Sequence, residues 1–117
     1  MKITIYHNPR CSKSRASLQL LQEKNLDIQV IEYLKTPPNF VELQKIIAQL
    51  NLTAEQLIRK SETIYKENYK GKKLSPKEWI EAMVQHPKLI ERPIVIYGDK
   101  AVIGRPIEQV EQLILEA

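Results

Sequence analysis

The amino-acid sequence predicts an α/β fold around one mixed sheet, with elements in the order β-α-β, a helical block, then β-β-α. The first 33 residues alternate strand, helix and strand patterns, which is typical of a parallel βαβ unit with a right-handed crossover. Near the other end, two short apolar runs flank Gly98-Asp99, a two-residue hairpin signal. No repeat, long linker or low-complexity tract divides the chain, so we expect a single domain over residues 1–117, with the helical insertion at about 36–91.

The βαβ unit begins with residues 3–6, a β-branched and aromatic run that predicts a short buried strand. Good helix formers with leucines among them then predict a helix from about Ser12 to Lys24, with Asn25 as its stop. The apolar residues that follow predict a second strand over 28–33.

The helical block is predicted from apolar periodicity and capping signals. Apolar residues at helical spacing predict a helix over 40–50, and Thr53 and Gln56 have capping-box spacing for a short helix. A further helix is expected around Tyr65 and Tyr69, and Ser75-Pro76 starts another that Pro87 ends. The positions expected to face a core are Phe40, Leu43, Ile46, Ile47 and Leu50 in the first helix and Trp79, Ile80, Met83 and Val84 in the last.

The last third of the chain returns to strand patterns. Residues 94–97 and 101–103 predict the two strands of the hairpin. Pro106 is expected to open a final helix whose apolar face holds Ile107, Val110, Leu113 and Ile114.

Composition excludes several classes of protein. The 117 residues are 43% hydrophobic and 27% charged, which fits a chain with a real core and not a disordered one. A single cysteine excludes an internal disulfide or a cysteine-rich zinc site. No long apolar run or signal peptide is present, so we expect a cytoplasmic protein without a membrane partner. The net charge of +4 favours anionic ligands and is too small to indicate nucleic acid.

Cys11 lies where the first strand passes into the first helix, among polar and turn-forming residues. A helix start offers unpaired N–H groups and a positive dipole end, and Arg10, Lys13 and Arg15 add positive charge. These effects favour the thiolate, the nucleophilic form, over a thiol that is only slightly ionised at neutral pH. Two interpretations are open for each of two neighbours. His7 is either a surface residue at the strand end or a group that assists the sulfur. Ser14 either directs its hydroxyl at the sulfur or is simply a polar residue of the first helical turn.

Two known cysteine motifs are absent. A dithiol redox site needs Cys-x-x-Cys, but Ser14 occupies the second position. A phosphatase-type loop needs arginine six residues after the cysteine, and that residue is Ser17. A resolving thiol for Cys11 must therefore come from another molecule.

The sequence resembles the glutaredoxin-linked arsenate reductase (ArsC) family, and within it the short YfgD-like members. The resemblance rests on several motifs that occur in family order along nearly the whole chain. They are residues 3–15, Leu57-Ile58-Arg59-Lys60, Gln85-His86-Pro87, Glu91-Arg92-Pro93-Ile94-Val95 and Ile103-Gly104-Arg105-Pro106.

The resemblance implies a thioredoxin-like (glutaredoxin-like) fold with a helical insertion, and it implies roles for individual residues. The family's nucleophile falls on Cys11, with its assisting histidine and serine on His7 and Ser14. The three arginines that bind the oxyanion fall on Arg59, Arg92 and Arg105, which suits a tetrahedral anion that would otherwise repel a thiolate. The fold's cis-proline falls on Pro93.

The activity that the resemblance implies is reduction of arsenate to arsenite, with glutathione as co-substrate and glutaredoxin as the partner that regenerates Cys11. No bound cofactor or metal and no nucleic acid is expected, and we expect a monomer. Two alternatives stay open. One is a regulator of the Spx kind that binds RNA polymerase through the helical block, with the basic residues 70–73 as its best feature. The other is a glutathione-linked reductase of a different oxyanion or of a mixed disulfide.

Overall fold

The structure is a computed structural model, which describes the backbone of residues 2–116 and the side chains of residues 2–115. The chain divides into two compact units. One unit contains the residues up to Thr36 and those from Arg92 onward, and the other contains Pro37–Glu91.

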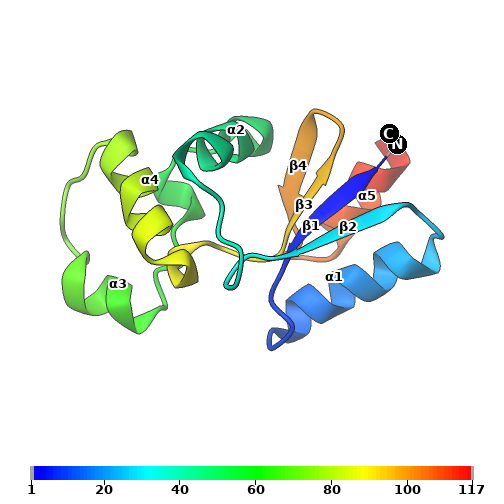
Figure 1. Cartoon of the computed structure of the whole chain (residues 1–117), viewed down its shortest axis with the longest axis horizontal. Coiled ribbons are helices and arrows are strands. Elements are labelled where there is room, and N and C mark those ends of the chain that lie inside the picture. Colours follow the sequence, from blue (N-terminus) through cyan, green and yellow to red (C-terminus); the bar gives the residue numbers. More distant parts are fainter. Residues whose placement is uncertain (1, 117) are drawn as a thin grey trace. The chain divides into compact units, whose positions relative to one another are not determined.

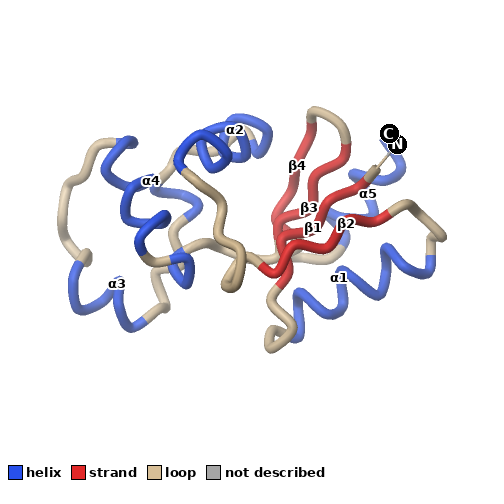
Figure 2. Tube along the Cα trace, in the orientation of Figure 1, coloured by secondary structure: helices blue, strands red, loops and turns tan. Residues whose placement is uncertain are grey.

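The first unit is built on a four-stranded mixed sheet in the order β2-β1-β3-β4 (Figure 2). Strand β1 (Ile3–His7) pairs in parallel with β2 (Ile28–Glu32), and helix α1 (Ser12–Glu23) connects them (Figure 1). Strand β3 (Ile94–Tyr97) pairs antiparallel with both β1 and β4 (Lys100–Ile103). The predicted α/β class, the parallel βαβ unit and the Gly98-Asp99 hairpin are all confirmed.

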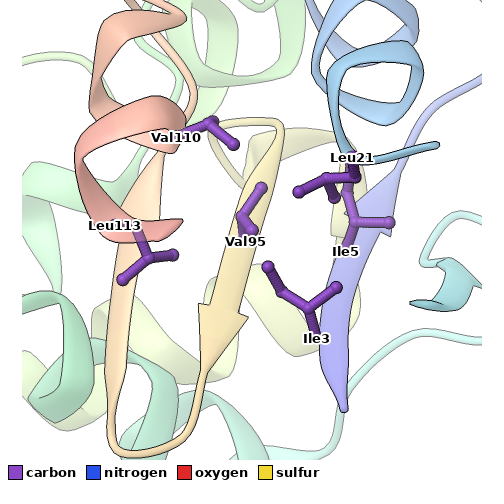
Figure 3. Packing of buried hydrophobic residues seen from close by; sticks show 6 residues of the cluster. All are labelled: Ile3, Ile5, Leu21, Val95, Val110 and Leu113. Atoms are coloured by element: carbon purple, nitrogen blue, oxygen red, sulfur yellow. The ribbon is translucent and has the colours of Figure 1, made fainter. Parts of the chain in front are cut away.

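A hydrophobic cluster holds α1 and the last helix, α5 (Glu108–Glu116), on the same face of the sheet (Figure 3). It arises because alternate residues of a strand point to one face, while residues three or four apart line one side of a helix. Its buried members are Ile3 and Ile5 of β1, Val95 of β3, Leu21 of α1, and Val110 and Leu113 of α5.

The structure shifts several of the predicted boundaries in this unit by one or two residues. Strand β1 includes His7, β4 begins one residue earlier than expected, and α5 begins at Glu108. Pro106 precedes the helix by two residues and contributes a turn, in which its carbonyl accepts from the N–H of Gln109. The peptide bond before Pro93 is cis, and so is the bond before Pro106, which the sequence did not lead us to expect.

The second unit is helical and contains α2 (Phe40–Leu50), α3 (Thr63–Asn68) and α4 (Pro76–Gln85), with short 3-10 helices at Glu55–Leu57 and Pro87–Leu89. Capping boxes begin both longer helices, with Asn39 before α2 and Ser75 before α4. Most of the predicted apolar face is buried, but three residues expected in the core are only half-buried. They are Phe40, Leu50 and Val84.

A short backbone pairing closes this unit. Ile58 and Ile90 form an isolated antiparallel bridge, the N–H of Arg59 donates to the carbonyl of Leu89 at 2.7 Å, and Glu91 donates to Leu57 at 2.9 Å. The backbone at Arg59 is therefore held firmly. None of the described helices is long and apolar enough to cross a membrane.

Candidate active site

Cys11 occupies the N-cap position of α1, immediately after the loop that leaves β1. Its backbone is extended, its N–H donates to the carbonyl of Asn8, and its own carbonyl accepts the first helical bond, from Arg15. Within the loop, the Asn8 side chain accepts from the N–H of Arg10. The cysteine residue is only 8% exposed. The loop therefore places a largely shielded sulfur at the amino end of the helix, as the sequence predicts.

The surroundings of Cys11 favour its thiolate. Burial acts to raise the pKa of the thiol, but the N–H groups of Ser14 and Lys13 and the charges of Arg92 and Arg105 outweigh it, so the pKa lies below its ordinary value. The direction agrees with the sequence prediction, whereas the charged groups responsible are different. The cations expected from the neighbouring sequence were Arg10, Lys13 and Arg15. Those that lower the pKa of the thiol are Arg92 and Arg105, from the far end of the chain.

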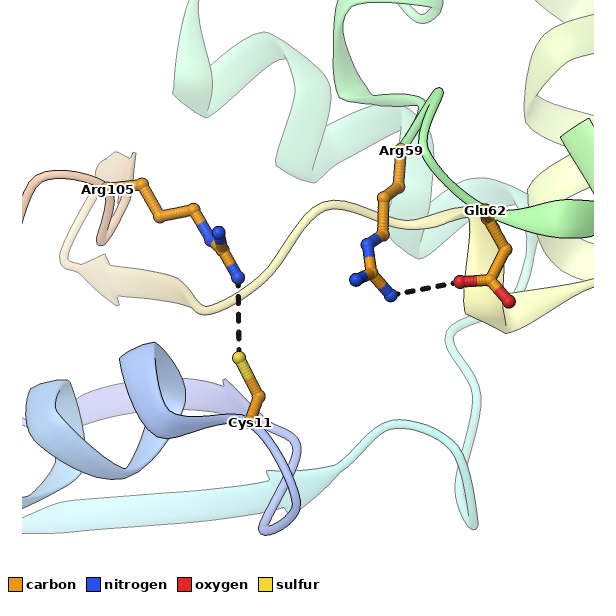
Figure 4. A network of polar contacts seen from close by, with 4 residues as sticks. All are labelled: Cys11, Arg59, Glu62 and Arg105. Atoms are coloured by element: carbon orange, nitrogen blue, oxygen red, sulfur yellow. Dashed lines mark hydrogen bonds and ion pairs between the residues drawn. The ribbon is translucent and has the colours of Figure 1, made fainter. Parts of the chain in front are cut away.

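Arg105 contacts the sulfur directly. Its Nη2 atom donates to Cys11 Sγ at 3.4 Å, and its Nε atom donates to the carbonyl of Arg92 at 2.8 Å (Figure 4). The second bond fixes the orientation of the guanidinium plane, and the first presents its positive charge to the thiolate. Ninety-four positions of sequence separate this arginine from the cysteine.

Arg92 contributes a buried cation with unused hydrogen-bonding capacity. The residue is 7% exposed, and its Nε and Nη1 atoms are buried without a hydrogen-bond partner among the described residues. Buried donors are normally paired, and a buried charge is costly unless an anion compensates it. Arg92 and Arg105 together therefore form a positive site beside the sulfur that suits an oxyanion.

His7 and Ser14 form a buried polar pair next to Cys11. The Ser14 Oγ atom lies 2.6 Å from His7 Nδ1 and accepts from the N–H of Asn8 at 2.9 Å. These are the two hydrogen-bond partners of the Ser14 hydroxyl. The backbone N–H of Ser14 interacts with the sulfur instead.

His7 is also not the surface residue that the sequence suggested, since it is only 6% exposed. Desolvation lowers the pKa of its imidazole, an effect that Glu32 opposes and Arg15 assists. The ring is therefore mainly neutral at neutral pH. It supports the loop through Ser14 and does not supply a positive charge to the thiolate.

Arg59 lies in the helical unit, two residues beyond a 3-10 helix. Its Nη1 atom donates to Glu62 Oε2 at 2.9 Å, an ion pair between two partly buried side chains (Figure 4). Glu62 was not expected in this role, although its spacing three residues after an arginine is a common one for such pairs. Of the three predicted arginines, Arg92 and Arg105 lie beside Cys11. Arg59 belongs to the second unit, where it pairs with Glu62.

No metal site accompanies these residues in the part of the chain that is described, since nowhere there do three or more His, Cys, Asp or Glu side chains gather in a suitable way. The chemistry available is that of a stabilised thiolate beside two guanidinium groups.

The ArsC family matches residues 6–113, a stretch that begins in β1 and ends in α5. This chain belongs to the ArsC family. An arsenate reductase of Neisseria meningitidis serogroup A is 43% identical over 115 residues, which cover 97% of this chain and 98% of that relative. The protein named uncharacterized YfgD, of Escherichia coli K12, is 46% identical and covers 97% of each chain.

A solved structure agrees with the ArsC fold described above. The arsenate reductase from Vibrio cholerae superposes with a TM-score of 0.91 at 46% identity, covering 96% of this chain and 97% of that one. The four-stranded sheet with its helices is therefore the thioredoxin-like fold of the ArsC family, as expected from the resemblance.

Proposed function

We propose that this protein is a thiol-dependent arsenate reductase in which Cys11 is the nucleophile. The observation that carries the proposal is the contact between Arg105 and the Cys11 sulfur at 3.4 Å, next to the unpaired donors of Arg92. Relatives that cover nearly the whole chain are named arsenate reductases, which supports arsenate as the oxyanion.

In the first step, arsenate binds to Arg92 and Arg105, and the Cys11 thiolate attacks arsenic. An As–S bond forms, an As–O bond breaks, and the departing oxygen takes up protons and leaves as water. The two guanidinium groups offset the repulsion between the anion and the thiolate. We assign Arg59 the same task, on the basis of the family motif that it matches.

In the second step, the thiolate of glutathione attacks the Cys11 sulfur. An S–S bond forms, and the electron pair of the As–S bond remains on arsenic, which leaves as arsenite. Arsenic gains two electrons, and the two thiols lose them in forming the mixed disulfide. Glutaredoxin then restores the Cys11 thiol by exchange. Because the chain has no second cysteine, the thiol that attacks Cys11 and the thiol that later regenerates it both come from other molecules, as they would in a reducing cytoplasm.

The test is arsenite formation with arsenate, glutathione and glutaredoxin. We expect turnover by the natural chain, loss of it in Cys11→Ser, and a drop of roughly a hundredfold in Arg92→Ala, because a guanidinium that binds the anion is gone. Arg10→Ala, which removes an exposed cation from the same loop, serves as the matched control. Undiminished turnover in Cys11→Ser would refute the mechanism.

The same assay separates the alternatives. Turnover with a different oxyanion or a glutathione mixed disulfide, and none with arsenate, would favour another glutathione-linked reductase. Capture of RNA polymerase by a protein that is inactive on all of these substrates would favour a regulator.

A further inference from the structure

We propose that Gly104 and Ser17 are positioning residues whose close packing holds Arg105 in register with Cys11. The effect of this contact on turnover rests on the proposed function, whereas its effect on the cysteine does not. Neither residue is expected to touch the substrate. Both belong to the unit that carries Cys11, Arg92 and Arg105.

Gly104 lies in a space too small for any side chain. A Cβ atom built on it would stand 2.5 Å from Ser17 Oγ, 2.9 Å from Pro93 Cγ and 3.2 Å from Val110 Cγ2. Its φ angle is not in the left-handed region, unlike those of the other two glycines, Gly71 and Gly98. Close approach of the neighbouring elements, and not backbone conformation, is therefore what requires glycine at this position.

Ser17 forms the tightest side of this space. It lies on α1, is fully buried, and its Oγ atom has no hydrogen-bond partner among the described residues. Because this hydroxyl has no partner, it does not stabilise the packing through a hydrogen bond, and its burial costs free energy. The small size of the residue lets the end of β4 approach the helix whose first residues hold the cysteine.

The close packing of Gly104 against Ser17 affects the position of Arg105, because Arg105 follows Gly104 directly in the chain. The N–H of Gly104 donates to the Pro93 carbonyl at 2.9 Å, and the N–H of Arg105 donates to Ile103 at 2.8 Å. Arg105 is an exposed residue, and its side chain is held by its bonds to the Arg92 carbonyl and to the sulfur. A backbone displacement at Gly104 would lengthen or misalign the 3.4 Å contact with Cys11 and so weaken it.

The experiment compares Gly104→Ala, Ser17→Ala and the double variant, with the pKa of Cys11 measured from the pH dependence of thiolate absorbance. We expect Gly104→Ala to raise the pKa of the thiol and to lower kcat/KM for arsenate roughly tenfold, as when a hydrogen bond to a charged group is lost. Ser17→Ala keeps the small side chain that the packing requires and is the reference for the double variant. The double variant should regain much of what Gly104→Ala loses, because the nearest clashing atom is gone.

Gly71→Ala is the matched glycine control, since a Cβ there meets nothing within 4 Å and the residue lies in the other unit. It strains the backbone, so a loss of stability without a change in the Cys11 pKa is expected. If Gly104→Ala does not fold, Ser17→Thr crowds the same space from the helix side and should raise the pKa as well.

An unchanged Cys11 pKa in folded Gly104→Ala would overturn the proposal, and absence of any recovery in the double variant would overturn the role of Ser17. Because the thiol pKa is measured without arsenate, these outcomes are distinct from failure of the proposed activity. An inactive natural chain would refute the arsenate reaction and leave the positioning test intact.

Discussion

The reactivity of Cys11 comes from groups that approach it from two directions. The N–H groups of its own helix and the guanidinium groups of Arg92 and Arg105 all favour the thiolate, and together they overcome the opposing effect of burial. His7 and Ser14 hold the loop in place and add no positive charge. Individual side chains can therefore be tested for distinct effects on the sulfur and on the loop.

Arg105→Ala should raise the pKa of the Cys11 thiol, because it removes the cation that contacts the sulfur at 3.4 Å. The pH dependence of thiolate absorbance, or of alkylation by iodoacetamide, measures this directly. Arg10→Ala is the control, since its exposed side chain is not among the groups that shift the thiol. Equal pKa values in the two variants would contradict the assignment.

Ser14→Ala should destabilise the fold and leave the pKa of Cys11 nearly unchanged. It removes the partner of His7 Nδ1 and the acceptor for the Asn8 N–H, a loss of about 1–3 kcal/mol for buried groups left unpaired. The backbone N–H that interacts with the sulfur remains. Urea unfolding and thiolate titration measure the two effects, and Ser12→Ala, at an exposed neighbour, is the control. A large change in the thiol pKa would show that the hydroxyl acts on the sulfur after all.

Among the elements, the helices of the second unit are the ones with the strongest local signals. Helix α2 begins and ends as predicted, with a complete capping box at Asn39 and Glu42 and a left-handed residue, Asn51, at its end. Its buried residues Leu43, Ile46 and Ile47 follow the predicted periodicity. Because capping and periodicity agree, changes at the cap should act on stability and not on the cysteine.

Asn39→Ala should lower the free energy of unfolding by about 1 kcal/mol, because it removes the acceptor for the N–H of Glu42. The pKa of Cys11 should stay the same, since α2 belongs to the other unit. Urea denaturation measures the change, with Gln44→Ala at an exposed position of the same helix as control. A Gln44→Ala effect as large as that of Asn39→Ala would count against the capping contribution.

For the whole molecule, the buried His7 connects folding to pH. Desolvation holds the pKa of its imidazole below the ordinary value of 6.5. At pH values between the lowered pKa of the folded chain and 6.5, the unfolded chain binds the proton on this histidine and the folded chain does not. Protonation therefore favours unfolding. The other resolved shift in a side chain that ionises in acid is that of Glu78, whose capping role lowers its pKa from 4.5 and therefore acts at lower pH.

The neutral His7 imidazole should therefore contribute stability that is fully present above its ordinary pKa of 6.5 and is lost as the pH falls below 6.5. Urea midpoints measured at a series of pH values test this. His7→Gln should flatten the decline between neutrality and the range where carboxylates titrate. A natural chain whose stability does not change over that interval would contradict a buried neutral imidazole.

Much of the fold could be predicted because its signals are local. The βαβ order, the hairpin at Gly98-Asp99 and the capped helices depend on residues within a few positions of one another. The half-burial of Phe40, Leu50 and Val84 could not be predicted, because periodicity identifies the apolar side of a helix and not how far its neighbours cover it.

In the candidate site, too, features set by neighbouring residues could be predicted and features set by tertiary packing could not. Its cysteine, the helix start beneath it and the need for an outside thiol were accessible from the sequence, since each concerns Cys11 and its immediate neighbours. The residues next to Cys11 pointed to nearby cations, and only the family resemblance pointed to Arg92 and Arg105. Which cations face the sulfur depends on tertiary structure, because β3 and β4 bring these two arginines to it from the far end of the chain. Burial likewise turned His7 from an expected surface residue into a neutral partner of Ser14, because desolvation depends on packing in three dimensions.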